Sequence, residues 1–166
     1  MLNDFDKLYI TKEFDNLLGE AGSKFSVVSP KPNTTDDIYG EDYEAIIKGE
    51  ELYNEPYEFI GLVRYNPKPE EISPKGQEHK VDTIFDITVS QLLKYIPIKI
   101  GENDHSKRII LADDHSLITE EGNTLISLTD YIQLDEVKYE IINIKPYSSF
   151  RSDILLFKIE CVSKKF

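Results

Sequence analysis

The stretch LTDYIQLDEVKYEIINIKPYS, residues 128–148, constrains the fold more than any other part of this 166-residue chain. Apolar and polar residues alternate on both sides of the pair Asp135–Glu136. Alternation places every second side chain on one face of a β-strand, and a polar pair between two such runs is typical of a tight turn. The stretch therefore predicts a β-hairpin that turns at Asp135–Glu136 and ends at Pro146. One face of this hairpin must be buried, which favours a β-rich core.

The rest of the chain contains further short segments of the same kind. Residues 81–90, VDTIFDITVS, alternate strictly, and strands are also predicted in KFSVV, in Tyr57–Tyr65, in RIILA and in ILLFKIECV. Ten Tyr, eight Phe and no Trp suit such a fold, because aromatic rings pack well on pleated, half-buried surfaces. The side chains expected in one common core are Val81, Phe85, Ile87, Val89, Ile132, Leu134, Tyr139, Ile141, Ile144, Leu155 and Phe157.

Two helices are predicted beside these strands. Apolar residues at helical spacing begin at Leu2 and continue as far as Leu18, where Gly19 breaks the pattern. Ser90 can cap a short helix over QLLKY, because its hydroxyl can accept a hydrogen bond from the first turn. Pro97 follows that helix closely, so we expect the segment IPIKI to be extended.

These elements predict a mainly β chain of the α+β kind. We expect a small β-barrel or sandwich with an N-terminal helical arm over residues 1–22 and one short helix. Residues 23–166 would form a single β-rich domain, with loops at residues 66–76 and 101–107. Both loops have little apolar content with which to pack, so we expect them to be mobile in a lone subunit.

The formal net charge of −12 is carried mainly by residues 1–82. Such a surface argues against general affinity for DNA or for anionic membranes, since binding to either gains most from basic residues. The start MLNDFDKLYI lacks the regions of a signal peptide, and no apolar run approaches the roughly 18 residues that span a bilayer. The single cysteine, Cys161, is expected to be a reduced core residue, in a protein made in the cytoplasm.

One cluster of potential metal ligands is present. The tripeptide Asp-His-Ser occurs twice, and a hairpin could bring its imidazoles and carboxylates together. The flanking Gly, Asn and Ser residues favour solvated turns instead. We therefore expect no metal, no cofactor, no catalytic residue and hence no enzyme. The residues that a metal site would use are Asp104, His105, Asp113, Asp114 and His115.

Three pieces of the sequence, taken in order, resemble the neck proteins of tailed bacteriophages, which are head-closure, head–tail connector or head-completion proteins. The first is DDIYGEDY, the second runs from EPYEFIGLV to TVSQLL, and the third is DYIQLDEVKYEIINIKPYSSFRSDILLFKIECV. Thr129 and the pair Asp135–Glu136 replace glycines that are usual in the family's hairpin, and residues 99–127 look like an insertion. The hairpin pattern is matched at Asp130, Ile132, Tyr139, Glu140, Ile141 and Pro146.

This resemblance implies a structural protein of the virion neck, assembled in the host bacterial cytoplasm as a homo-oligomeric ring, sixfold or twelvefold, around the DNA channel. The implied neighbours are a portal or adaptor protein and a tail-tube or terminator protein. DNA would pass through without specific binding, and acidic residues facing the bore would repel its phosphates. Apolar and aromatic surface must drive association, and the expected contact residues are Leu2, Phe5, Leu8, Tyr9, Tyr39 and Tyr43.

Three alternatives stay open at this point. A tail-terminator or portal-adaptor protein of the same particle fits the same resemblance. A small metal-dependent hydrolase would use Asp104, His105, Asp113 and His115, and bound metal in the purified protein would favour it. An acidic protein that mimics DNA would use the net negative charge, and stoichiometric binding to a nuclease would favour it.

Overall fold

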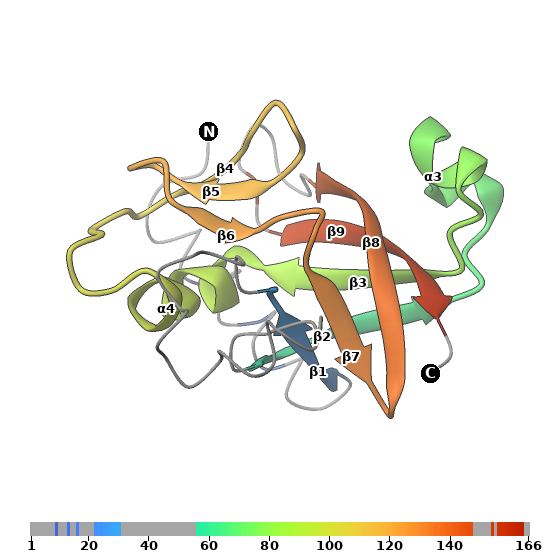
Figure 1. Ribbon diagram of the computed structural model, residues 1–166, viewed down its shortest axis with the longest axis horizontal. Coiled ribbons are helices and arrows are strands. Elements are labelled where there is room, and N and C mark those ends of the chain that lie inside the picture. The colour runs from blue at the N-terminus through green and yellow to red at the C-terminus, as the bar shows by residue number, and fades with distance from the viewer. Residues whose placement is uncertain are drawn as a thin grey trace, which may run out of the picture.

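The computed structural model describes Tyr9, Glu13, Asn16, residues 22–30 and 56–147, Ile154 and residues 156–164. The chain is mainly β, as predicted, and forms a closed six-stranded barrel beside a separate three-stranded sheet (Figure 1). The elements in chain order are β1 (Ser23–Val28), β2 (Tyr57–Tyr65), η2 (Pro69–Glu71), α3 (Pro74–Glu78), β3 (Thr83–Thr88), α4 (Val89–Lys99), β4 (Ile109–Leu111), β5 (Leu117–Thr119), β6 (Thr124–Ile126), β7 (Tyr131–Leu134), β8 (Val137–Tyr147) and β9 (Leu156–Lys164).

The barrel has the strand order β1-β2-β3-β9-β8-β7, and all of its neighbouring strands are antiparallel. After β3 the chain leaves the barrel for α4 and the small sheet β4-β5-β6, and it returns with β7. The pairing of β7 with β1 closes the barrel, so residues far apart in sequence become neighbours. The small sheet and α4 lie at one end of β3, and α3 lies at the other (Figure 1).

Gly61 marks the point where β2 changes its partner. Gly61 pairs with Ser23 of β1, whereas the next residue, Leu62, already pairs with Asp86 of β3. The two neighbouring strands approach so closely that a Cβ atom at Gly61 would lie 2.1 Å from the Asp86 carbonyl oxygen and 2.9 Å from the Phe25 ring. Glycine is required here because only a residue without a side chain fits this corner of the barrel.

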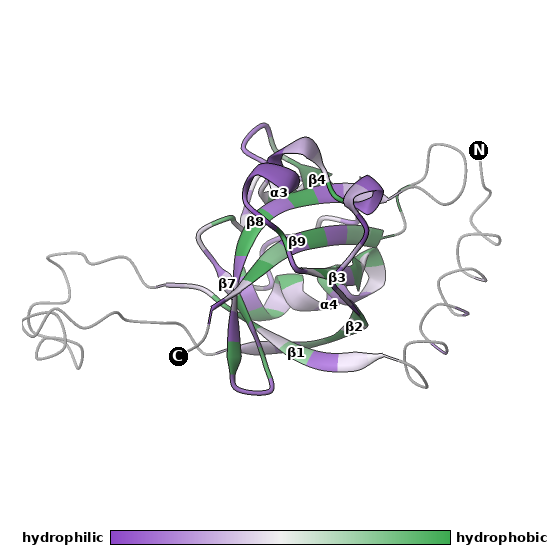
Figure 2. Ribbon diagram, turned by 90° about the vertical axis from the view of Figure 1, so that its right-hand side faces the viewer, coloured by the Kyte–Doolittle hydropathy of each residue, from purple (hydrophilic) through white to green (hydrophobic). Residues whose placement is uncertain are grey.

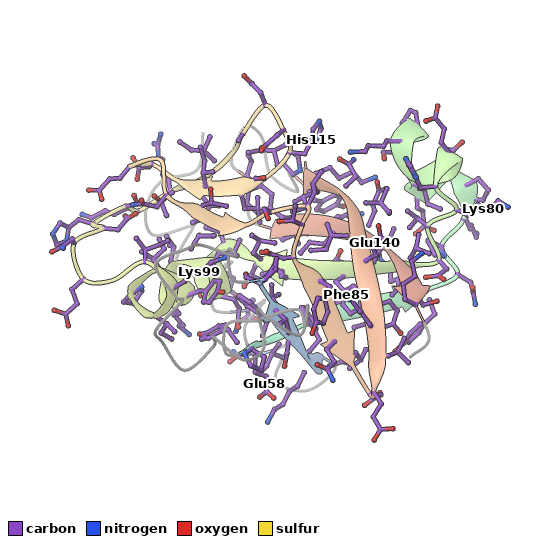
Figure 3. All side chains as sticks on the ribbon, viewed as in Figure 1. Glu58, Lys80, Phe85, Lys99, His115 and Glu140 are labelled. Carbon is purple, nitrogen blue, oxygen red and sulfur yellow. The ribbon has the colours of Figure 1, made fainter. Side chains whose placement is uncertain are left out.

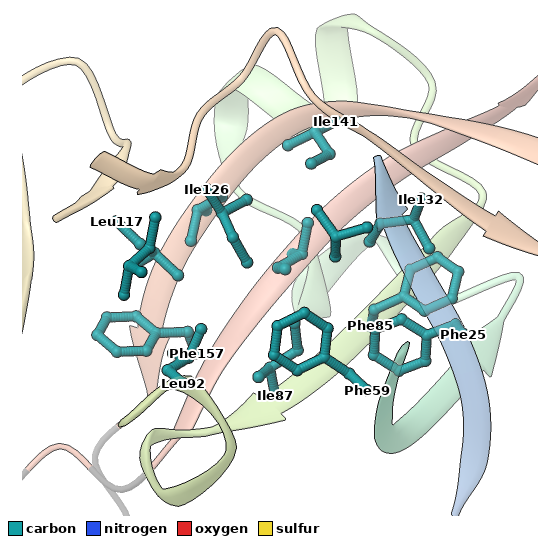
Figure 4. Packing of buried hydrophobic residues seen from close by; sticks show 14 of the residues in the cluster. Phe25, Phe59, Phe85, Ile87, Leu92, Leu117, Ile126, Ile132, Ile141 and Phe157 are labelled. Carbon is teal, nitrogen blue, oxygen red and sulfur yellow. The ribbon is translucent and has the colours of Figure 1, made fainter. Parts of the chain in front are cut away.

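Aromatic rings fill the barrel (Figure 4). Phe85 is fully buried, and its ring centroid lies 4.9 Å from that of Phe25 and 5.0 Å from that of Tyr139. Every described residue of the predicted core is buried except Val89, which is half-buried because it begins α4 instead of continuing β3. Val81 is buried outside this common core, beside Gly76 of α3. Leu155 lies outside the described residues. Burial of each large side chain contributes about 1.5–3 kcal/mol, so this core is the main source of stability.

The predicted hairpin is β7–β8. Leu134 pairs with Val137, and both turn residues have positive φ, 51° at Asp135 and 67° at Glu136. This geometry is that of a type I′ turn, which usually contains Asn and Gly. The prediction that Pro146 ends the second strand was wrong, because β8 continues to Tyr147. Among the described residues, β7 pairs with β8 only as far as Glu140. Pro146 therefore lies where β8 pairs with β9 alone, and the missing N–H is tolerated.

The helix after β3 is longer than predicted. Thr88, not Ser90, is its N-cap, and its hydroxyl accepts a hydrogen bond from the Gln91 N–H at 3.3 Å. The segment IPIKI is largely helical instead of extended, because α4 continues through Pro97 to Lys99. Pro97 lies in the last turn, where its missing N–H removes only one helical hydrogen bond. Leu92, Tyr95 and Ile96 point into the core and close one end of the barrel.

The expected loop over residues 66–76 contains two short helices. Pro69 and Pro74 occupy first-turn positions of η2 and α3, where a missing N–H costs nothing. The Ser73 hydroxyl caps α3 by accepting a hydrogen bond from the Gly76 N–H. Asn66 N–H donates to the Asp82 carbonyl at 2.8 Å, so the segment leaves and re-enters the barrel at one place. Residues 66–80 are called the strap below.

Candidate functional site

The repeated tripeptide Asp-His-Ser forms the same turn twice. An Asp104 carboxylate oxygen accepts a hydrogen bond from the Ser106 N–H at 2.9 Å, and Asp114 accepts one from the Ser116 N–H at 3.0 Å. In both cases the aspartate side chain holds the backbone two residues further on, which is the Asx turn. The repeat is therefore explained by turn geometry without a metal ion.

The small sheet separates the two tripeptides. Ile109 pairs with Thr119 and Leu111 pairs with Leu117, so residues 112–116 form the connecting loop at one end of the β4–β5 hairpin. Lys107 N–H donates to Glu120 Oε1 at the opposite end, where the first tripeptide lies. His105, Asp113, Asp114 and His115 are exposed, and His115 Nδ1 lies 3.3 Å from the Ile144 carbonyl oxygen at the edge of β8 (Figure 3). The suggested meeting of all these groups across a hairpin was wrong.

Asp104 is the one buried member of the candidate set. Besides Ser106, it accepts hydrogen bonds from Thr119 Oγ1 at 2.6 Å and from Asn123 Nδ2 at 2.8 Å. Burial acts to raise the pKa of Asp104, but the hydrogen bonds from Asn123, Ser106 and Thr119 outweigh it and hold the pKa below its ordinary value. Asp104 thus joins residues 101–107 to the small sheet, and its oxygens are occupied by donors. Within the described part of the chain, no group of three or more His, Cys, Asp or Glu side chains could hold a metal ion.

Of the six expected contact residues, the structure describes only Tyr9. Tyr9 belongs to a helical segment, and 61% of its surface is exposed. An exposed aromatic ring of this size is suited to contact with a partner. Leu2, Phe5, Leu8, Tyr39 and Tyr43 lie outside the described residues, so their role as contacts stays a prediction.

A group of interacting charges lies on the outside of the barrel, and the sequence did not predict it. One row crosses four strands, because Arg64 pairs with Ile84, Ile84 with Glu160, and Glu160 with Asn143. The next row contains Asp86, which pairs with Lys158, and Lys158 pairs with Lys145. We call this surface the charged face; its residues are Arg64, Asp86, Asn143, Lys145, Lys158 and Glu160.

The strap covers the charged face and is fastened to it by polar contacts. Glu160 is fully buried and accepts hydrogen bonds from the N–H (2.7 Å) and the hydroxyl of Ser73. Glu71 of the strap contributes two acceptors: its carboxylate binds Arg64 Nη1 at 3.0 Å, and its carbonyl accepts from Lys145 Nζ at 2.9 Å. Figure 2 looks at the molecule from this side and shows α3 as a largely hydrophilic element.

Burial alters the acid–base behaviour of this face. The pKa of Asp86 is raised by burial, although Arg64 Nη2, 3.2 Å away, acts in the opposite direction. The pKa of Lys158 is lowered by burial first and by the positive charge of Arg64 second. Lys158 belongs to none of the ion pairs among the described residues, and its ammonium lies 4.3 Å from the centroid of the Tyr147 ring.

A second buried charge pair joins the barrel to α4. Lys99 Nζ lies 3.7 Å from the Asp130 carboxylate, and it donates to Ser29 Oγ at 3.1 Å and to the Leu125 carbonyl. The pKa of Lys99 is lowered by burial, which Asp130 partly offsets. Burial, Asp130 and Tyr57 raise the pKa of nearby Tyr95 to about 12. These contacts join four segments, so we assign a structural role to the pair Lys99–Asp130 and not a catalytic one (Figure 3).

Comparison of the chain with protein families, with curated proteins and with solved structures finds no match. None of the helices in the described ranges is both long and apolar enough to cross a membrane.

Proposed function

We propose that this protein is a structural subunit of the neck of a tailed bacteriophage, located in the virion between portal and tail and assembled as a ring around the DNA channel. The observation that carries the proposal is the resemblance of three sequence pieces in the same order as in neck proteins. The hairpin positions of that resemblance have clear structural roles that support it: Ile132, Tyr139 and Ile141 are buried in the barrel core. Asp130 is buried beside Lys99.

The architecture supports a particular mode of assembly. Each barrel strand has two neighbouring strands, but among the described strands the part of β8 beyond Glu140 pairs with β9 alone. Association would therefore use this length of strand edge together with arms and loops, with exposed aromatic groups such as Tyr9 supplying apolar contact area. Such a ring needs no catalytic residue. The net charge of −12 would keep subunits apart until a portal or adaptor ring places them side by side.

The decisive experiment is complementation of a phage that lacks this protein. Full-length protein should restore filled heads with attached tails, and electron microscopy should place its labelled copies at the neck. Protein without residues 1–18 should keep its folded barrel but be incorporated poorly. Normal particles with no copy of the protein would contradict the neck assignment. Normal particles with the truncated protein would contradict only the role of the N-terminal arm in assembly.

The same resemblance supports a second candidate, a tail-terminator or portal-adaptor protein. Cross-linking in intact particles separates these roles, because a terminator would be linked to the tail tube and an adaptor to the portal. The acidic DNA-mimic reading rests on the net charge alone. Stoichiometric binding to a nuclease, with no ring in particles, would contradict the neck proposal and favour the DNA-mimic hypothesis.

A further inference from the structure

The strap and the charged face beneath it form an interface that differs from the barrel core. The two helices of the strap bury only Gly76, and the contacts to the barrel centre on Glu160 and Glu71. Polar contacts of this kind add little net stability, because each replaces a hydrogen bond to water. A segment with few buried apolar groups opens at a lower free energy than a packed core. The strap therefore has the properties of a local unit that can open while the barrel stays folded.

The backbone conformation at the two ends of the strap also supports a local opening. Asn66 and Lys80 have positive φ values of 50° and 58°, a region that residues other than glycine occupy at a cost. These two residues bound the segment, and a change in their φ and ψ would swing it away from the barrel. Asparagine adopts this region at little cost, so the strain lies at Lys80, and its relief would favour the open form.

The cover is also imperfect. Within the described part of the chain, two buried side-chain atoms have no hydrogen-bond partner: Arg64 Nε and Asn143 Oδ1. Arg64 and Asn143 lie at opposite ends of the same row on the charged face. Native interfaces rarely leave such atoms unpaired, so the strap does not match the polar groups under it as a permanent cover would.

The charge balance shows what could replace the strap. On the face itself, three cations (Arg64, Lys145 and Lys158) meet two carboxylates (Asp86 and Glu160). Glu71 of the strap supplies the remaining negative charge. The two acceptors of Glu71, its carboxylate and its main-chain carbonyl, are both groups that any acidic peptide carries. Nucleic acid fits less well, because its row of phosphates would face Asp86 and Glu160.

We propose that the strap is a releasable cover and that the charged face is a docking surface for an acidic peptide segment of a partner protein. The carboxylate of that segment binds Arg64 in place of the Glu71 carboxylate. A main-chain carbonyl of the segment accepts from Lys145 in place of the Glu71 carbonyl, and a main-chain N–H donates to Glu160 in place of the Ser73 N–H. The strap is thus an internal copy of the ligand. This inference does not depend on the neck assignment.

Amide hydrogen exchange tests the opening. The strap amide of Ser73, which donates across the interface to Glu160 of the barrel, should exchange by a local opening in the full-length protein. Glu71→Gln should speed its exchange about tenfold or more, since a charge-assisted contact is weakened, and should leave the barrel amides unchanged. The matched control is Glu70→Gln, which removes an exposed neighbouring carboxylate and should change nothing. Strap amides that exchange only together with barrel amides would overturn the proposal.

A peptide of the strap itself, residues 68–78, tests the docking. The labelled peptide should bind to the Glu71→Gln protein in a fluorescence titration, and the same peptide with Glu71→Gln should bind about tenfold more weakly. Arg64→Ala in the Glu71→Gln background should abolish this preference for the acidic peptide, and circular dichroism of each variant verifies that the barrel is folded. Absence of binding at millimolar peptide, or equal binding of the two peptides, would overturn the docking surface.

Discussion

The closed barrel and the three-stranded sheet are both β-structures, but they are held together in different ways. The barrel strands extend to eleven residues in β8 and enclose a core of aromatic and branched side chains. The sheet strands β4, β5 and β6 have three residues each, and their loops depend on Asp104 and Asp114. The barrel is specified by alternation over long strands, whereas the small sheet is specified by polar side chains that hold its turns.

The largest effect is expected inside the barrel. Phe85→Ala should lower the free energy of unfolding by about 3–5 kcal/mol, because a fully buried ring in contact with Phe25 and Tyr139 is lost and leaves a cavity. Urea denaturation followed by circular dichroism measures this loss. The control Tyr65→Ala removes a ring that is 58% exposed and should cost no more than about 0.5 kcal/mol. Similar costs for the two variants would contradict an aromatic core as the main source of stability.

The next effect concerns the corner at Gly61. Gly61→Ala should lower the free energy of unfolding by about 1–3 kcal/mol, because the added methyl group collides with the Asp86 carbonyl and β2 must shift. Glu58→Ala on the same strand is the control, since Glu58 is exposed and its substitution should be almost neutral. A neutral Gly61→Ala variant would show that the barrel does not require the change of partner at this residue.

A smaller, pH-dependent effect is expected in the small sheet. The pKa of Asp104 in the folded state lies below its unfolded value of 3.8, so the carboxylate stabilises the fold above that pH. This contribution is lost as the pH falls below 3.8 towards the folded pKa. Asp104→Asn should therefore lower the melting temperature at pH 7 and have a smaller effect at pH 2.5. Asp113→Asn, in an exposed loop, is the control, and a pH-independent effect of Asp104→Asn would exclude this role of the charge.

The smallest effect should be a gain in stability, at the barrel hairpin. Glu136 adopts φ 67°, which suits glycine better than glutamate, so Glu136→Gly should stabilise the protein by about 0.5–1 kcal/mol. Gln133→Gly in β7 is the matched control and should destabilise by a similar amount, because glycine there only loses strand preference. If both variants destabilise, the turn is not strained in solution.

Much of the barrel could be predicted from local sequence. The alternation around Asp135–Glu136 and in residues 81–90 identified β8, β7 and β3 together with the inward side chains, since a strand repeats every two residues whatever its neighbours are. The end of α4 was predicted too early, before Pro97. A proline in the last turn of a helix removes only one hydrogen bond, so the helix preference of that residue does not decide where the helix ends.

The sequence by itself determined that the chain is mainly β, which strand residues point into the barrel, and that it turns at Asp135–Glu136. Only the tertiary structure decided that the strands close into a barrel and that the charged face exists, because its residues come from two strand pairs, β2–β3 and β8–β9, that are far apart in the chain. It also decided that Glu160, in an apolar strand, is a buried anchor for Ser73. A polar residue between apolar neighbours predicts an exposed side chain, and only a segment folded over it from elsewhere can reverse that expectation.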